Sequence, residues 1–396
     1  MNVLKVLRAC FAVACLCLIS GAGCADEYRT VVDSRGVQVQ VPAEINRVVT
    51  ISDGLVEGVM TVLGVEDTLV GIGSGCVSKV YEYTYPTVKG EDYRYEKGMD
   101  PVTYLNPQFV DLPLVSMSGA LNYETLASLD PDVIIARAGD CTLRIDDEAS
   151  MNKTIDTIES LGLTLVVIRS PNTFDEPDLS TISDEIRIMG QVFGKEDEAV
   201  ELANYLEEEV EFVRARTKDI QDEEKPEVLV LGLASKAREA GGVGYGHGLN
   251  SIESYLVEDV VNARNAYQEP CLWNIMSPEH VLESDPDVII LNTFSGYHPP
   301  RELYEAPYYQ NLQEMDAIKN KRVAALRWSP CNCDMRLEYP IDIMVIAKAA
   351  YPERFEDVDL GEWLLDFYMN VYNVDRETAV ELRSAQWMDW VLEEGN

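Results

Sequence analysis

The thiol groups are the side chains of this 396-residue chain with the most specific chemistry. Thiolates ligate soft or borderline metals, whereas cysteines of an exported protein more often form disulfides. Cys76 and Cys141 each follow an expected strand and are a candidate disulfide pair. Cys331 and Cys333 are too close to pair easily with each other, so one of them could bridge to Cys271. Disulfides, metal ligation and incidental thiols are the three alternatives for these loops.

Imidazole groups are the second candidates for metal chemistry, and the chain has three histidines. His247 lies in a glycine-rich stretch, residues 241–248, and His298 follows an expected strand, so both are expected to face a binding site. An imidazole there could be an axial ligand of iron or cobalt, or it could only form hydrogen bonds. His280 lies on an expected helix and is expected to be exposed. The candidate metal ligands are therefore His247, His298, Cys331 and Cys333.

Aromatic and basic side chains complete the candidate ligand site. Planar rings suit a large, flat and partly apolar metal chelate, and arginine can pair with its carboxylates. The alternative for Trp328 and Phe294 is an ordinary place in the core. Few cations accompany these rings, which argues against a highly anionic siderophore. The candidate ligand-binding residues are Cys76, Cys141, Arg144, Tyr245, His247, Phe294, Tyr297, His298, Trp328 and Arg336.

Common catalytic and nucleotide-binding motifs do not occur in the sequence. Residues 71–76 and 241–248 are glycine-rich, but neither stretch fits G-x-G-x-x-G, because Cys76 and His247 hold the position of the third glycine. Phosphate-binding loops, nucleophile elbows, C-x-x-C, H-E-x-x-H and calcium loops are also missing. A formal net charge of −37 argues against nucleic acid as a partner. We therefore expect a binding protein without a required cofactor rather than an enzyme.

An internal repeat marks the elements that must position these residues. Residues 122–135 read NYETLASLDPDVII, and residues 277–290, at an offset of 155, read SPEHVLESDPDVII. Each copy predicts a short helix that carries a glutamate, a break at Pro131 or Pro286, and a buried strand. Polar residues follow each strand, at the edge where ligands bind in open α/β sheets. The repeat therefore predicts two similar α/β lobes that present loops at this edge.

The rest of the chain divides around this repeat. We expect an N-terminal α/β lobe over residues 25–194, a connecting helix over 195–224 and a C-terminal α/β lobe over 225–396. Residues 81–109 are rich in tyrosine, show no clear period and are expected to form a long surface excursion, whose role the sequence leaves open. The connecting helix is expected because one apolar face continues, without strand signals, through Val200, Ala203, Leu206, Val210 and Val213.

The first 24 residues have the pattern of an export signal. Lys5 and Arg8 precede a 12-residue apolar run, residues 9–20, which is too short to span a bilayer. The small residues GAG then lead to Cys24, in the manner of a lipoprotein cleavage box. We expect secretion across the cytoplasmic membrane and an anchor lipid on Cys24, with cleavage after Ala25 as the alternative.

Three further stretches, together with the repeat, carry a resemblance to a known family. TVVDSRGVQVQVP at residues 30–42 is similar to an opening hairpin, WNIMSPE at 273–279 to a segment before a second-lobe helix, and AKAAYPERF at 347–355 to a late helix end. In this order they resemble the periplasmic-binding proteins that serve ABC importers of iron–siderophores, haem and cobalamin. The resemblance runs from about residue 28 to the C-terminus, and residues 81–109 look like an insertion relative to compact members.

The resemblance implies an α/β fold of two Rossmann-like lobes joined by a single long helix, with a shallow cleft between the lobes. It also implies that one glutamate of each lobe docks with arginines of the permease, and Glu124 and Glu279 hold these positions. A glutamate favoured by the helix dipole is the alternative for both.

The expected function is therefore capture of a metal chelate outside the cytoplasm. An iron complex, haem or a corrinoid would be the ligand, and an ABC permease with its ATPase would be the partner. Two rival predictions remain: a receptor for a bare metal ion held by Cys and His, and a surface redox or metal enzyme.

Overall fold

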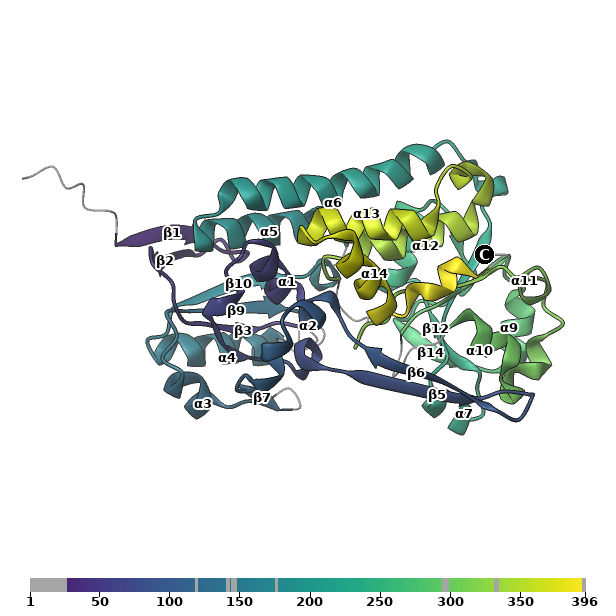
Figure 1. The fold of residues 1–396 in the computed structure, drawn as a ribbon, viewed down its shortest axis with the longest axis horizontal. Coiled ribbons are helices and arrows are strands. Elements are labelled where there is room, and N and C mark those ends of the chain that lie inside the picture. Colours follow the sequence, from purple (N-terminus) through teal and green to yellow (C-terminus); the bar gives the residue numbers. More distant parts are fainter. Residues whose placement is uncertain are drawn as a thin grey trace, which may run out of the picture.

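The computed structural model describes residues 27–117, 120–139, 143, 148–174, 177–293, 299–330 and 335–393. Two sheets lie toward opposite ends of an elongated molecule, and a layer of helices runs along one side of it (Figure 1). No helix in these ranges is long and apolar enough to cross a membrane.

The first lobe is built on a four-stranded parallel sheet in the order β10-β9-β3-β4. Both central strands are buried along their whole length, as expected for continuous runs of Val and Ile in a parallel sheet. An antiparallel hairpin precedes the sheet, as the sequence predicts. The elements are β1 (Tyr28–Val32), β2 (Gln38–Pro42), β3 (Val48–Ile51), α1 (Leu55–Val62), β4 (Leu69–Ile72), α2 (Pro101–Leu105), α3 (Tyr123–Ser128), β9 (Val133–Ala138), α4 (Glu148–Ser160) and β10 (Leu165–Arg169).

The second lobe is built on a mixed sheet in the order β14-β12-β11-β15-β16. The glycine-rich stretch 241–248 is not only a loop, since it contains strand β12, antiparallel to both neighbours. Glycine is needed there because a Cβ on Gly244 would lie 2.5 Å from the carbonyl oxygen of Gly232. The strands are β11 (Glu227–Gly232), β12 (Gly244–His247), β13 (Arg264–Asn265), β14 (Trp273–Met276), β15 (Val288–Leu291) and β16 (Val323–Ala325).

The sequence repeat is a structural repeat. Helices α3 and α9 (Pro278–Ser284) each end at an aspartate in the left-handed conformation, Asp130 at φ 45° and Asp285 at φ 37°. The next aspartate of each copy binds the backbone just before or at the start of the neighbouring strand. Asp132 accepts from the N–H of Arg47 at 2.9 Å, and Asp287 accepts from the N–H of Glu227 at 2.9 Å. The repeated Asp-Pro-Asp therefore ends a helix and fixes a parallel strand pair in both lobes.

A long helix, α6 (Glu196–Thr217), connects the two lobes. It packs against α5 (Ser180–Phe193) of the first lobe and α12 (Tyr339–Ala350) of the second. Its predicted apolar face is buried except for Val200, which is exposed. Two later helices, α13 (Leu360–Tyr372) and α14 (Arg376–Ala385), also contact α1 and α2, so the helical layer binds both lobes. The fold is the predicted pair of α/β lobes joined by one long helix.

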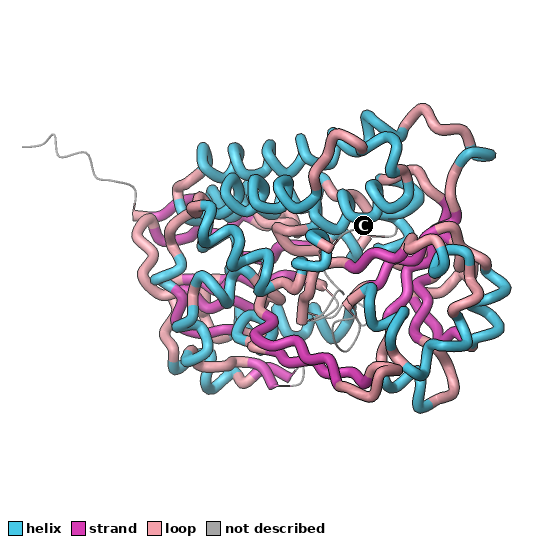
Figure 2. Tube along the Cα trace, turned by 45° about the vertical axis from the view of Figure 1, so that its right-hand side comes forward, coloured by secondary structure: helices cyan, strands magenta, loops and turns pink. Residues whose placement is uncertain are grey.

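The tyrosine-rich stretch differs from the expected surface excursion, because it forms a hairpin that reaches the other lobe. Its strands are β5 (Tyr81–Pro86) and β6 (Asp92–Gly98), which run on the side of the molecule opposite α6 (Figures 1 and 2). Its tip meets α10 (Pro300–Glu305): the Tyr83 hydroxyl donates to Glu302 at 2.6 Å, and the Val88 N–H donates to the Glu305 carbonyl at 2.8 Å. The hairpin is therefore a second connection between the lobes.

Candidate functional site

A buried arginine lies near the carboxyl end of the first sheet. Arg137 of β9 is fully buried, and its Nε and Nη2 donate to the two carboxylate oxygens of Glu185 at 2.8 and 2.9 Å. Its Nη1 lies 3.2 Å from the carboxylate of Asp53, which follows β3. A bidentate pair of this kind fixes the plane of the guanidinium group. Helix α5 and the loop after β3 thus position the arginine at this edge.

A segment of the second lobe before helix α12 lies directly against this arginine. Arg336 is buried, and its Nε donates to the backbone carbonyl of Asp53 at 2.9 Å. In the opposite direction, Arg137 Nη1 donates to the carbonyl of Met335 at 2.7 Å. Arg336 also donates to Ser329, which follows β16. Residues at the carboxyl edge of the first sheet are therefore joined by direct hydrogen bonds to the segment before α12, which Arg336 connects to Ser329 after β16.

Two buried carboxyl groups at this junction have raised pKa values. Burial raises the pKa of Asp100 to about 7, although Arg336, 3.8 Å away, opposes the shift. Burial also raises the pKa of Asp342 to about 6, against the opposing effect of Arg327 at 3.2 Å. Within the described part of the chain, neither oxygen of Asp100 has a hydrogen-bond donor. Asp100 therefore exchanges its proton near neutral pH and Asp342 at slightly lower pH, and Asp100 has hydrogen-bonding capacity to spare.

Several predicted ligand residues lie at or close to this junction. Arg336 is at its centre, and Cys76 follows β4, half-buried, with its backbone N–H bonded to Ser74 Oγ at 3.1 Å. Trp328 is buried, with its ring stacked on Tyr81 and edge-on to Trp387, each at 5.8 Å between centroids. This packing favours a structural place for Trp328 at the base of the hairpin.

The remaining predictions at the ligand site have different outcomes. Tyr245 of β12 meets Trp273 edge-on at 5.1 Å, in the second lobe. The other predicted ligand residues lie outside the described residues: Cys141, Arg144, Phe294, Tyr297, His298, Cys331 and Cys333. Cys24 lies outside them as well.

His247 is buried inside the second lobe. Its Nδ1 lies 3.0 Å from the carboxylate of Glu253, and its Nε2 lies 2.8 Å from the side-chain amide of Asn292. Burial alone would raise the pKa of Glu253, but the imidazole of His247 and the hydrogen bonds from the backbone and Asn292 together outweigh this effect and lower the pKa. Both ring nitrogens thus have polar neighbours, which favours hydrogen bonding over ligation for this histidine.

Two of the candidate cysteines, Cys76 and Cys271, lie within the described residues. Cys271 is a half-buried free thiol, and its Sγ lies over Gly248, where a Cβ would approach it to 2.7 Å. Its possible partners, Cys331 and Cys333, lie outside the described residues, as does Cys141, the candidate partner of Cys76. Across the described ranges, no group of three His, Cys, Asp or Glu side chains is arranged to hold a metal ion.

The two repeat-related glutamates occupy equivalent exposed positions. Glu124 lies in the first turn of α3, which Asn122 caps by accepting from the N–H of Thr125 at 3.0 Å. Glu279 lies in the first turn of α9, which Ser277 caps by accepting from the N–H of His280 at 3.2 Å. Hydrogen bonds from its own backbone and from Ser277 lower the pKa of Glu279. Glu279 is therefore a carboxylate on an exposed helix start.

Sequence reasoning missed four charged residues of the junction. Asp53 and Arg327 each lie two residues after a strand, β3 and β16, so their place after a strand could have identified them. Asp100 and Glu185 lie at the start of α2 and inside α5, away from any strand end, and no sequence pattern marks them.

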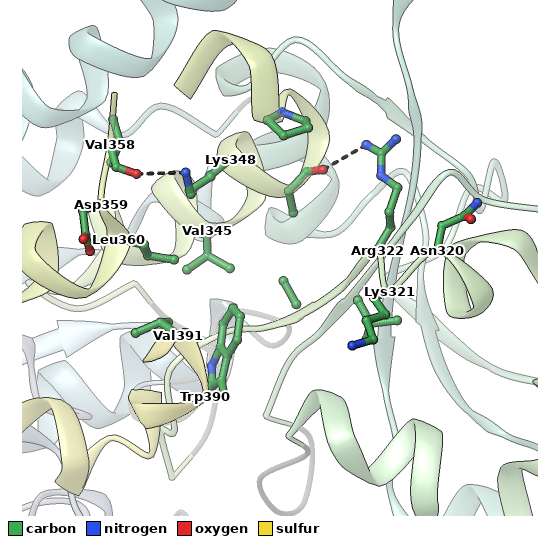
Figure 3. A pocket seen from close by; sticks show the side chains of 14 residues that line it. Asn320, Lys321, Arg322, Val345, Lys348, Val358, Asp359, Leu360, Trp390 and Val391 are labelled. Carbon is green, nitrogen blue, oxygen red and sulfur yellow. Dashed lines mark hydrogen bonds between the residues drawn. The ribbon is translucent and has the colours of Figure 1, made fainter. Parts of the chain in front are cut away.

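A separate cavity of about 510 Å³ lies in the second lobe, between the residues before β16, helix α12 and the start of α13 (Figure 3). Lys348 donates there to the carbonyls of Phe355 and Val358 at 3.0 and 2.8 Å, and Arg322 donates to the Ala349 carbonyl at 3.0 Å. These cations therefore stabilise backbone carbonyls near helix ends. Lys321 and Arg322, which line the cavity, precede β16, whereas the junction of the lobes is formed by residues that follow β16. The cavity is therefore separate from the junction.

Comparison with known proteins gives consistent similarities. The family model described as periplasmic binding protein matches residues 49–329. An uncharacterized ABC transporter substrate-binding lipoprotein of Bacillus subtilis, YvrC, is 23% identical over 206 residues, which span 51% of this chain and only 57% of that protein. The molybdate-binding protein MolA of Haemophilus influenzae is 21% identical over 384 residues, 91% of this chain and 95% of that protein.

Solved structures show the same fold at low sequence identity. A periplasmic solute binding protein of Veillonella parvula has a TM-score of 0.67 at 20% identity, over 93% of this chain and 100% of that one. Helicobacter pylori CeuE with Ni(II) bound has a TM-score of 0.61 at 17% identity, over 89% and 98%. The family match runs through the strands of both sheets and the helix between the lobes, and the chain therefore belongs to the periplasmic binding protein family, the substrate-binding proteins of ABC transporters.

Proposed function

We propose that this protein captures an iron complex or a corrinoid between the carboxyl ends of its two sheets and delivers it to an ABC permease. The observation that supports the site most directly is the pair of bonds across the junction, from Arg336 to Asp53 and from Arg137 to Met335. Side chains of both lobes meet at the edge where open α/β sheets bind their ligands.

The charges at the junction favour a neutral or weakly charged complex. Even with Asp100 protonated, the buried carboxyl groups of Asp53, Glu185, Glu338 and Asp342 outnumber the three buried arginines nearby, Arg137, Arg327 and Arg336. A highly anionic chelate would meet repulsion there, because removal from water strengthens every unbalanced charge. Corrinoids and ferric complexes of low net charge avoid this penalty.

The printed descriptions of the similar proteins also favour a metal-containing ligand. MolA is described as bound to molybdate, CeuE as bound to nickel, and RhuT of Roseiflexus as heme-binding. These ligands differ in size and charge but share a metal. Their variety supports the class of ligand and leaves its identity to experiment.

Delivery requires a place outside the cytoplasm and a docking surface. We propose that Cys24 carries an anchor lipid and that Glu124 and Glu279 pair with arginines of the permease. Their equivalent positions on α3 and α9 support this, since a two-lobed receptor on a two-subunit permease needs one equivalent contact in each lobe.

A ligand screen by absorption spectroscopy tests the proposal. The purified protein is titrated with haemin, aquocobalamin, ferric citrate and a ferric hydroxamate, and also with molybdate and Ni²⁺ alone. We expect one metal complex to bind with a Kd of about 1 µM or lower and to be recovered unchanged. Binding of molybdate or Ni²⁺ alone would favour the bare-ion receptor and contradict the proposed ligand class.

A further inference from the structure

An exposed apolar patch lies next to one of the two repeat-related glutamates. It consists of Leu249, Leu272, Trp273, Ile275 and Leu282, and we call it the β14 patch. Leu272 is 59% exposed, the largest value for a large apolar side chain in the described ranges, and Trp273 is 48% exposed. Single exposed apolar residues are ordinary, but a contiguous group of them marks an interaction surface.

Local structure brings the members of the β14 patch together. The residues on either side of Leu249 form hydrogen bonds with the segment before β14. The Gly248 N–H donates to the Leu272 carbonyl at 3.1 Å, and the Asn250 N–H donates to the Cys271 carbonyl at 3.1 Å. Strand β14 is the edge strand of the second sheet, and α9 packs against it. Leu282 lies three residues after Glu279 on α9, so both share one exposed helix face.

Two members of the β14 patch have small counterparts among the described residues of the first lobe. At the repeat offset of 155, Ala120 corresponds to Ile275 and Ala127 corresponds to Leu282. Both alanines are exposed. At these two positions the surroundings of the two glutamates therefore differ, apolar in the second lobe and small in the first.

We infer that the β14 patch is the apolar centre of the surface that docks on the permease, with Glu279 at its rim. The inference rests on the proposed function. Interfaces gain most of their affinity from central aromatic and apolar anchors, while rim charges set orientation and rate. The β14 patch provides such an anchor in the second lobe.

The negative charge around the β14 patch favours the permease over a second copy of this chain as the partner. Exposed Glu269, Glu279 and Glu283 flank the patch, on a chain of formal net charge −37. Two copies that met here would bring these carboxylates together, which is unfavourable. The complementary surface is apolar with basic residues around it, as expected of a permease face that receives Glu279.

Binding to the cognate permease–ATPase complex in nanodiscs tests this inference. We expect Leu272→Ser/Leu282→Ser to weaken binding about tenfold or more, because both side chains leave water on docking. The matched control is Leu161→Ser/Val200→Ser, which changes two exposed apolar residues away from the patch and should leave the Kd within about twofold. Circular dichroism and the affinity for the metal complex should be unchanged in both variants.

The outcomes separate this inference from the proposed function. If charge reversal at Glu124 and Glu279 abolishes binding while Leu272→Ser/Leu282→Ser does not weaken it, the docking role stands and the patch inference is wrong. If the wild-type protein does not bind the complex, both are wrong. Sedimentation velocity gives an independent check: a wild-type dimer that the patch variant converts to a monomer would assign the patch to self-association.

Discussion

Asp100 is the residue at which burial and charge conflict most openly. It is buried with both oxygens lacking a donor in the described part of the chain, and it lies 3.8 Å from Arg336. A carboxylate buried without hydrogen bonds is unfavourable, so the group retains its proton to higher pH. Residues of this kind are frequent at functional sites, where spare hydrogen-bonding capacity can serve a ligand.

The raised pKa of Asp100 predicts a specific pH dependence of stability. Between the ordinary carboxyl pKa and about 7, the folded protein binds this proton and the unfolded chain does not. The contribution of this group to the free energy of unfolding is therefore fully present at low pH and is lost as the pH rises through 7. The upper estimate of the loss is roughly 4 kcal/mol. In Asp100→Asn, the midpoint temperature of thermal unfolding should decrease less between pH 5 and pH 8 than it does in the wild-type protein.

The exposed Asp67→Asn provides the control for this experiment, and it should keep the wild-type pH profile. Equal pH profiles for wild type and Asp100→Asn would show that Asp100 does not hold a proton in the folded state.

At the scale of elements, the β5–β6 hairpin is the main feature that distinguishes this chain from a simple two-lobed fold. Its tyrosines alternate with polar residues, so one face is aromatic and the other is charged. Two-stranded hairpins are marginal in water on their own. Burial of the aromatic face, the bond from Tyr83 to Glu302 and the guanidinium of Arg301 over Tyr93 at 3.9 Å therefore hold it across the lobes.

Removal of one hairpin ring tests this role. Tyr85 is 1% exposed, so Tyr85→Ala should destabilise the protein by about 3 kcal/mol in urea unfolding. Its neighbour Thr84 lies on the exposed face, so Thr84→Ala should cost less than about 0.5 kcal/mol. If both variants lost the same stability, the aromatic face would not be what holds the hairpin.

Strands and helices with strong local patterns could be predicted from the sequence. The run Leu69–Ile72 and the repeat strands have the predicted places, because continuous apolar runs after a helix are typical of parallel strands. The hairpin could also have been predicted, since Tyr81, Tyr83 and Tyr85 alternate with polar residues, as in a half-buried strand. Strand β12 could not, because its glycines are set by the approach of neighbouring backbone and by no local pattern.

The residues that meet at the candidate site were harder to predict from the sequence than the strands and helices. Arg336 was expected at the ligand site, and the structure places it at the junction of the lobes; its role in ligand binding stays a prediction. Its partners Asp53 and Asp100 come from segments more than 200 residues away, and only the packing of the lobes brings them to it. His247 was expected at a binding surface, but the strand that carries it lies within the second sheet, beside Glu253 and Asn292.

At the scale of the whole molecule, the fold and the family agree on a binding protein. The prediction that the chain is not an enzyme is confirmed, since the family and the similar structures are periplasmic binding proteins. The long helix, the helical layer and the hairpin all connect the lobes, so we expect little change in the angle between them on ligand binding. We therefore expect the permease to recognise fixed surfaces, and we propose one glutamate on each lobe as its contacts.

ATPase stimulation in proteoliposomes is the measurement that tests this account most directly. The cognate permease–ATPase complex is assayed with the wild-type protein and with Glu124→Arg/Glu279→Arg, each loaded with the metal complex found in the screen. We expect the variant to bind this ligand with an unchanged Kd and to lose nearly all stimulation, because both docking charges are reversed. Stimulation by the variant equal to that of wild type, or loss of its ligand affinity, would contradict the account.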